Sequence, residues 1–220
     1  MIKKIYANAD NTITNAHIPT PNGFSNTRAT GSNMGASDII EVYGLYANYS
    51  TSSAEISRAL IQFPISEISS SRDSGEIPAS GSVNFFLSLK DAPSLETLPS
   101  DYTLSIYAVS SSWEEGAGLD MDNYSDLTYD VVGSNWIRRT GSTSWDTIGG
   151  DYLTGTLVTQ SFPNGNEDLY VDVSSVVESW LDSSYENYGF IIKLSQSFEP
   201  YFSSSTGNNV SPDIHNPFGS

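Results

Sequence analysis

The sequence predicts an all-β protein: a single jelly-roll-like antiparallel β-sandwich that carries one short helix and one long loop rich in Trp, Gly and Asp. Short stretches with β-branched or aromatic residues at alternate positions recur along the chain and are separated by turn residues, as expected for strands with one buried face. Aromatic residues make up 12% of the 220 residues and charged residues only 16%, so the chain can build a large core. An all-β chain of this length commonly forms one domain.

The strands are expected where this alternation is clearest. Between Tyr102 and Ala108, every second residue is apolar or aromatic, which places these side chains on one face of a strand. The Pro-Asn-Gly-Asn sequence at 163–166 predicts a tight reversal, because Asn-Gly suits the backbone of a hairpin turn. In chain order, the expected strands cover residues 3–13, 38–46, 59–63, 83–89, 102–108, 157–162, 169–173 and 190–194, with turn-rich loops at 17–35 and 69–82.

One helix is expected at about residues 175–182. Ser175 and Glu178 have the spacing of a capping box, in which each side chain bonds the backbone of the other residue. The apolar face of this helix consists of Val176, Val177, Trp180 and Leu181. We therefore expect the helix to cover one end of the sandwich, with Trp180 buried beneath it.

The predicted sandwich domain spans residues 1–194, and residues 195–220 are expected to form an irregular C-terminal tail. This tail has no periodicity and contains no clear strand to pair with the apolar run at 190–194. An unpaired apolar strand edge recruits other strands. We therefore expect the edge at 190–194 to be covered by residues beyond Ser220 or by a partner chain, through β-strand addition.

The stretch from Trp113 to Tyr152 is expected to be an ordered loop on one end of the sandwich. Three of the four tryptophans lie here among many Gly and Asp residues, a composition that disfavours the interior of a helix. The stretch is also too long and too aromatic for a solvated linker. Long ordered loops are usually functional or packed by their own side chains, so we expect buried indoles to anchor this one.

Four sequence segments in this order carry a resemblance to a known family. They are Trp113 with the later Trp-x-x-x-Gly-Gly-Asp-Tyr at 145–152, the strand at 57–65, the segment 169–180, and Asn-Tyr-Gly with the strand that follows at 187–193. Together they resemble the DNRLRE-type β-sandwich domain, which is related to carbohydrate-binding modules. The likeness runs from about Tyr6 to Thr206. The sequence at 118–122 is similar to that of family members in structural proteins of marine tailed bacteriophages. The resemblance implies a β-sandwich and supplies no catalytic residues.

The charge of the chain excludes several classes of partner. Asp and Glu number 26 against 9 Lys and Arg, a formal net charge of -17. Nucleic-acid phosphates and anionic membrane surfaces would be repelled, so we expect neither as a partner. The charge suits a protein that stays soluble at high local concentration, and it also suits cation binding.

The composition and the start of the chain indicate where the protein works. Cysteine is absent, which excludes disulfides and thiolate metal sites. The first residues contain lysines but no apolar run of the kind that a secretory signal peptide needs, and no stretch is long enough to span a membrane. An extracellular type of domain without an export signal suits a virion component released by lysis, so we expect the protein in the virion or otherwise outside the cell.

An acidic loop is the candidate metal site. Asp120, Asp122 and Asp126 gather carboxylates over a short segment, as calcium requires, although the Gly and Glu that complete an EF-hand are missing. A second oxygen-rich turn contains Asn164, Asn166, Glu167 and Asp168. The alternative is that these side chains cap loops by bonding backbone amides. No cofactor is required, and calcium is the ion that the acidic loop would bind.

Exposed aromatic residues are the candidate carbohydrate site. Trp136 and Trp145, beside Arg138, are the candidates for stacking on sugar rings, whereas Trp113 and Trp180 lie in segments typical of a core. The alternative is that all the tryptophans are core residues. No catalytic residues are expected, because the chain has two histidines in loops and no nucleophile or phosphate-binding motif.

We therefore expect a non-enzymatic structural protein of a bacteriophage virion: a capsid decoration protein, or a neck, tail or fibre component. It would contact other virion proteins and form a homo-oligomer or multi-copy assembly. The alternative is a carbohydrate-binding or adhesion module that binds a glycan. Exposed Trp136 or Trp145 beside polar groups would favour glycan binding, whereas flat apolar patches or open strand edges would favour assembly.

Overall fold

The computed structural model describes residues 2–46, 53–93, 99–119, 124, 132–199, 201–203 and 208–210. The strands are β1 (Ala9–Thr14), β2 (His17–Thr20), β3 (Gly23–Arg28), β4 (Gly44–Tyr46), β5 (Ala54–Gln62), β6 (Phe86–Leu89), β7 (Tyr102–Ala108), β8 (Val158–Phe162), β9 (Leu169–Asp172), β10 (Phe190–Leu194), β11 (Tyr201–Ser203) and β12 (Asn208–Val210). The helices are α1 (Ser66–Asp73), α2 (Ser174–Leu181) and the 3-10 turn η2 (Thr154–Thr156).

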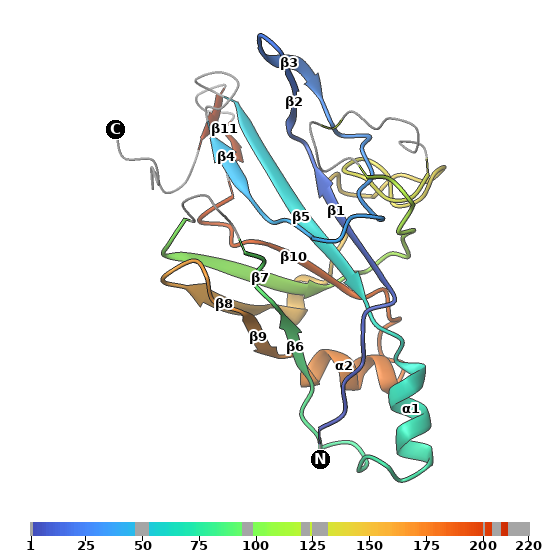
Figure 1. Cartoon of the computed structure of the whole chain (residues 1–220). Coiled ribbons are helices and arrows are strands. Elements are labelled where there is room, and N and C mark those ends of the chain that lie inside the picture. Colours follow the sequence, from blue (N-terminus) through green and yellow to red (C-terminus); the bar gives the residue numbers. More distant parts are fainter. Residues whose placement is uncertain are drawn as a thin grey trace.

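A six-stranded sheet forms the centre of the molecule (Figure 1). Its strands follow the order β1-β5-β10-β7-β8, and β4 pairs with the part of β5 that precedes the β10 pairing. A second sheet, β6–β9, lies against the first, and all pairings between named strands are antiparallel. The prediction of an all-β, antiparallel, sandwich-like fold is confirmed.

Strand β10 lies in the middle of the main sheet, so the predicted open edge at 190–194 is wrong. Phe190, Ile191 and Ile192 pair with β5 on one side, and the whole strand pairs with β7 on the other. All five residues of β10 are buried. The sheet therefore closes around this strand without residues beyond 220 or a partner chain.

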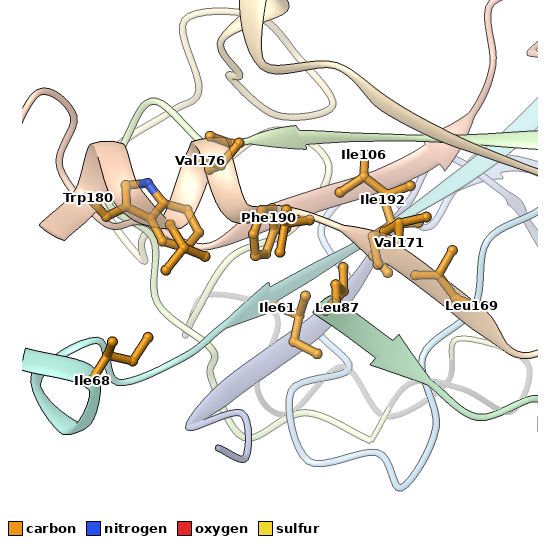
Figure 2. Close-up of a cluster of buried hydrophobic side chains, with 14 of the residues drawn as sticks. Ile61, Ile68, Leu87, Ile106, Leu169, Val171, Val176, Trp180, Phe190 and Ile192 are labelled. Atoms are coloured by element: carbon orange, nitrogen blue, oxygen red, sulfur yellow. The ribbon is translucent and has the colours of Figure 1, made fainter. Parts of the chain in front are cut away.

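One face of the main sheet packs on β6–β9 and the helices. Figure 2 shows side chains from both sheets meeting between them, with Ile61, Ile106 and Ile192 from the large sheet opposite Leu87 and Val171 from the small one. Trp180 of α2 packs on Phe190 at the helical end of this core, with ring centroids 4.7 Å apart. Alternate residues of β5 and β10 point into this core, as in any strand, although both segments are predicted from their continuous apolar runs.

The other face of the main sheet is covered by the stretch that contains the three tryptophans. Leu60 and Ile191, which point away from the first core, are packed with Trp136 and Trp145. The tryptophan stretch thus lies over a face of the main sheet. The expectation that it lies on one end of the sandwich is wrong. Both faces of β5 and β10 are consequently buried.

The helix predicted at 175–182 is confirmed, with Trp180 buried at 4% exposure. The predicted capping box is wrong, because the N-cap residue is Val173 and the first N–H, that of Ser174, donates to the Asp172 carboxylate at 2.9 Å. Instead the Ser174 hydroxyl accepts a hydrogen bond from the Phe85 backbone, and Glu178 forms an ion pair with Arg72 of α1. Helix α1 was not expected, since its serine-rich sequence buries only Ile68 and Ser71.

Three further segments differ from the sequence prediction. The stretch expected as a loop at 17–35 contains the β2–β3 hairpin. The first strand begins at Ala9, six residues after the expected start, and only Gly44–Tyr46 of the expected 38–46 strand forms β4. Beyond residue 194, β11 pairs with β12, and Glu199 is held against the sheet, so the tail is not irregular throughout.

The packing of Trp180 generates a stability prediction. Trp180→Ala should lower the free energy of unfolding by about 3–5 kcal/mol, because it removes a large packed aromatic side chain. The indole Nε1 is buried without a hydrogen-bond partner in the part of the chain described. Trp180→Phe should therefore cost less than half as much in the same urea titration. A loss below about 1 kcal/mol for the alanine variant would contradict the burial.

The Arg72–Glu178 pair generates a pH prediction. The hydrogen bond from Arg72 lowers the pKa of Glu178 below its usual value of 4.5. Because the folded pKa is the lower one, the ionised carboxylate stabilises the fold above about pH 5, and this contribution is lost as the pH falls through the folded pKa. The difference in unfolding free energy between the wild type and Glu178→Gln should be constant from pH 8 to about pH 5 and shrink towards pH 3.

The exposed Glu186 on the neighbouring loop provides the matched control, since its side chain makes no hydrogen bond or ion pair with the described residues. Glu186→Gln should show no such convergence in the same series of urea titrations. A wild-type advantage over Glu178→Gln that persists unchanged at pH 3 would contradict the assignment.

Candidate functional site

Two buried amide side chains hold the tryptophan stretch against the sheet. Asn33 is fully buried, and its Nδ2 donates to the Glu115 and Ser134 carbonyl oxygens at 2.7 and 2.8 Å. Its Oδ1 accepts the backbone N–H of Gly118 at 2.8 Å. Asn11 of β1 donates to the same Ser134 carbonyl at 2.8 Å. These side chains satisfy backbone groups that would otherwise be buried without partners, so they fix the path of three loops at once.

Glycines allow the chain to approach Asn33 this closely. A Cβ on Gly118 would lie 2.1 Å from the Asn33 carbonyl oxygen, and one on Gly116 would lie 2.4 Å from Asn33 Oδ1. Gly116 also has a φ of +86°, which residues with a side chain rarely adopt. The Gly-rich composition of this stretch therefore has a packing cause.

The structure contradicts the assignment of Trp136 and Trp145 as sugar-stacking residues. The two tryptophans are 7% and 4% exposed, and Trp145 Nε1 donates to the Asn135 carbonyl at 2.8 Å. Trp136 is covered by Arg58, whose guanidinium carbon lies 5.1 Å from the ring centroid. At both positions the indole is part of the core, because burying its large apolar surface is favourable. Arg138 is exposed and donates to the Gly141 carbonyl at 3.0 Å.

A charged cluster lies beside Trp136, next to the part of β5 between its pairing with β4 and its pairing with β10. Arg58 and Lys193 continue the cross-strand register of β5 and β10 and bring two cations together. Glu199 lies between them: its oxygens accept from Arg58 at 2.9 and 3.0 Å and from Lys193 Nζ at 2.6 Å. Burial lowers the pKa of Lys193, and the Glu199 carboxylate opposes this shift. Glu199 thus offsets part of the positive charge that the fold buries here, which is a structural role.

Three further glutamates bond backbone N–H groups. Glu115 Oε1 accepts the Asp10 N–H at 2.9 Å, and Glu114 Oε2 accepts the Gly141 N–H at 3.1 Å. Glu55 is buried, and its Oε2 accepts the His17 N–H at 2.8 Å. These contacts tie β1, β2 and β5 to the loops around them.

The candidate calcium ligands Asp120, Asp122 and Asp126 lie outside the described residues. Tyr124 is described, and its hydroxyl lies 2.7 Å from the Tyr43 hydroxyl. In the second oxygen-rich turn, Glu167 accepts the backbone N–H groups of Asn164 and Gly165, each at 2.9 Å, which is the loop-capping role. Among the residues that the structure describes, no group of three or more acidic, His or Cys side chains is placed to hold a metal ion.

Hollows in the described surface are shallow and polar. One of about 330 Å³ beside α1 is lined by serines with the Lys3–Glu76 ion pair, whose Nζ and Oε2 lie 2.7 Å apart. None of the described helices is long and apolar enough to cross a bilayer.

The outer face of β6–β9 carries an exposed aromatic pair, which we call the Phe86–Tyr170 stack. The ring centroids lie 4.7 Å apart and the ring planes differ by 6°. Phe86 is 44% exposed and Tyr170 is 61% exposed, whereas their strand neighbours Leu87 and Val171 point into the core. An exposed pair of large aromatic side chains on a flat sheet surface is typical of an interaction site.

The sequence contained the signal for this stack. In the apolar run at 83–89 and in the Leu-Tyr-Val-Asp segment at 169–172, strict alternation leaves Phe86 and Tyr170 on the face opposite to the core. An aromatic residue at the outward position of each of two paired strands is the pattern to search for. The register that pairs the strands is not readable from either segment alone.

Comparisons with known proteins give no further assignment: no protein-family model, no curated protein and no solved structure matches this chain. The candidate site therefore rests on geometry, and the Phe86–Tyr170 stack is the exposed surface that best fits an interaction.

The role of Asn33 generates a stability prediction. Asn33→Ala should lower the free energy of unfolding by about 3–5 kcal/mol, because each buried backbone group left unpaired costs about 1–3 kcal/mol. Asn166→Ala, in an exposed turn, is the control and should change stability by less than about 0.5 kcal/mol. Urea titrations followed by tryptophan fluorescence measure both. Equal effects of the two substitutions would show that Asn33 does not anchor the tryptophan stretch.

Proposed function

We propose that the protein is a non-enzymatic structural protein of a bacteriophage virion, present as a capsid decoration, neck, tail or fibre component, and that it contacts its neighbours through the outer face of β6–β9. The observation that carries the proposal is the Phe86–Tyr170 stack. It exposes two large aromatic side chains on a protein that otherwise carries a strong negative charge. Such a surface is costly to leave in water and favours a protein partner.

The described charged and polar clusters support a non-enzymatic role. Glu199 bonds both Arg58 and Lys193, and Glu114 and Glu115 hold backbone amides. Each of these groups is engaged in the fold. The virion assignment itself rests on the sequence resemblance to phage structural proteins, as does location in the virion or otherwise outside the cell.

A second candidate is a carbohydrate-binding or adhesion module, with its site moved from Trp136 and Trp145 to the Phe86–Tyr170 stack. Ser88 and Asp172 lie on the same outer face and offer hydrogen-bonding groups beside the rings. Aromatic rings beside polar groups are suited to sugar recognition. Calcium binding by Asp120, Asp122 and Asp126 stays a prediction that applies to either function.

The proposal predicts that the protein co-purifies with phage particles through this surface. Phage particles grown from the genome that encodes this chain should contain it in constant ratio to the capsid protein across a density gradient, measured by quantitative mass spectrometry. Phe86→Ser combined with Tyr170→Ser should reduce incorporation at least about tenfold, because it removes the apolar contact. Tyr185→Ser, which changes another exposed tyrosine (43% exposed), should leave incorporation unchanged.

Recovery of the chain only in the particle-free lysate would overturn the virion assignment. A glycan array with the wild-type protein and the double serine variant distinguishes the second candidate. Glycan binding that the double variant loses, without particle incorporation, would establish the carbohydrate function instead.

A further inference from the structure

We propose that the outer edge of β6 binds an extended, positively charged segment of a neighbouring protein, which adds to the β6–β9 sheet as a third strand beside the Phe86–Tyr170 stack. This inference rests on the proposed assembly function and specifies how the surface would hold its partner. Strand addition supplies affinity through backbone hydrogen bonds and selectivity through alternate side chains.

The register of β6 and β9 leaves backbone groups free for such pairing. The Val173 N–H donates to the Phe85 carbonyl at 2.8 Å, so the backbone groups of Phe85 face β9. Because the direction alternates along an antiparallel strand, Leu87 and Leu89 also face β9, whereas Phe86 and Ser88 point their N–H and C=O groups away from it. In the described structure these outward groups of Phe86 and Ser88 have no hydrogen-bond partner.

Two other sheet edges are covered by side chains in the described structure. On β1, the Asp10 N–H donates to the Glu115 side chain, and Thr12 Oγ1 accepts the Glu41 N–H. Between β8 and β9, Gln160 bridges the strands: its Nε2 donates to the Asp168 carbonyl and its Oε1 accepts the Tyr170 N–H. Among the described residues, none covers the edge of β6 in a comparable way, and both of its outward-facing residues are exposed.

The aromatic stack gives the added strand a side-chain contact. One face of the Phe86 ring lies against Tyr170 of β9, so its opposite face is turned towards the side on which a third strand would lie. A residue opposite Phe86 on the added strand would place its side chain about 5 Å away. An apolar residue at that position would cover the exposed ring.

Charge identifies the occupant as a basic segment and disfavours a second copy of this chain. Four acidic residues and one basic residue lie on or beside the two strands: Asp91, Glu167, Asp168, Asp172 and Lys90. Lys90 is already paired with Asp168, so it does not block the edge as a free lysine would. Two chains of net charge -17 would repel each other, whereas a segment with alternating Lys or Arg would be attracted.

Amide hydrogen exchange on the isolated protein tests the pairing directly. The probe is the peptide Ac-KVKFKVK-NH2, and the control is the same peptide with N-methyl groups on the backbone amides of alternate residues, which keeps the charge but blocks pairing. Saturating probe should slow exchange of the Phe86 and Ser88 amides at least about tenfold, as expected for new backbone hydrogen bonds. Equal binding of the N-methylated peptide, or no binding of the probe, would overturn the proposal.

A proline substitution provides a matched pair of variants. Ser88→Pro removes the outward N–H but no bond to β9, and proline is tolerated where an edge strand faces solvent. Ser88→Ala keeps the N–H. Ser88→Pro should weaken probe binding at least about tenfold while retaining a cooperative melt, and Ser88→Ala should bind as the wild type does. Unchanged binding by a folded Ser88→Pro variant would also overturn the proposal. If that variant fails to fold, Phe86→Ser takes its place, and unchanged binding again counts against the inference.

Two further measurements separate this inference from the function on which it rests. Protection of the Phe86 and Ser88 amides in the free protein at high concentration would identify a second copy as the occupant and reject the basic segment. If a folded Ser88→Pro variant is incorporated into particles as well as the wild type is, strand addition is rejected and the virion assignment still stands. Absence of the wild type from particles would reject that assignment, while the exchange experiment still decides the binding property of the edge.

Discussion

The structure depends on the burial of both faces of β5 and β10. Where the two strands pair, at 59–61 and 190–192, their side chains are apolar on both faces, so neither face of the main sheet is stable in water without a cover. The small sheet and the two helices cover one face, and the tryptophan stretch covers the other. This requirement explains why a long segment without regular strands is ordered: it contributes the indoles of Trp136 and Trp145 to the second core, while Asn11 and Asn33 satisfy its backbone.

Local sequence predicts the elements that have a clear apolar pattern, among them β7, β8, β9, α2 and β10. It failed where tertiary contacts decide the outcome. The strand at 190–194 was assigned to an edge, because the pairing partners that place it between β5 and β7 are more than 80 residues away in sequence. The β2–β3 hairpin was missed although Asn22-Gly23 carries the same turn signal as Asn164-Gly165. Helix α1 was missed because its stability comes from Ile68 and the Arg72–Glu178 pair, not from an apolar face.

The candidate site was less predictable than the fold. Tryptophan content indicated exposed stacking residues, but an indole next to a doubly apolar sheet is more favourable as a cover. The residues that do remain exposed, Phe86 and Tyr170, occupy outward positions on the paired strands β6 and β9. Whether a side chain is exposed depends on which layers cover the two faces of its sheet, and β6–β9 has a second layer on its inner face only. Composition alone does not show whether one face or both faces of a sheet are covered.

The central position of β10 also governs how the protein is made. The ribosome releases β1, β5 and β7 well before β10, so the emerging chain has a gap in the middle of its main sheet until residue 194 has been synthesised. During that interval β5 and β7 expose unpaired edges and apolar faces, the state in which nascent β-proteins aggregate. Closure requires pairings between segments distant in the chain, which folds slowly. The strong negative charge keeps incomplete chains apart by repulsion during this delay, which gives the acidic composition a role in biosynthesis as well as in the folded state.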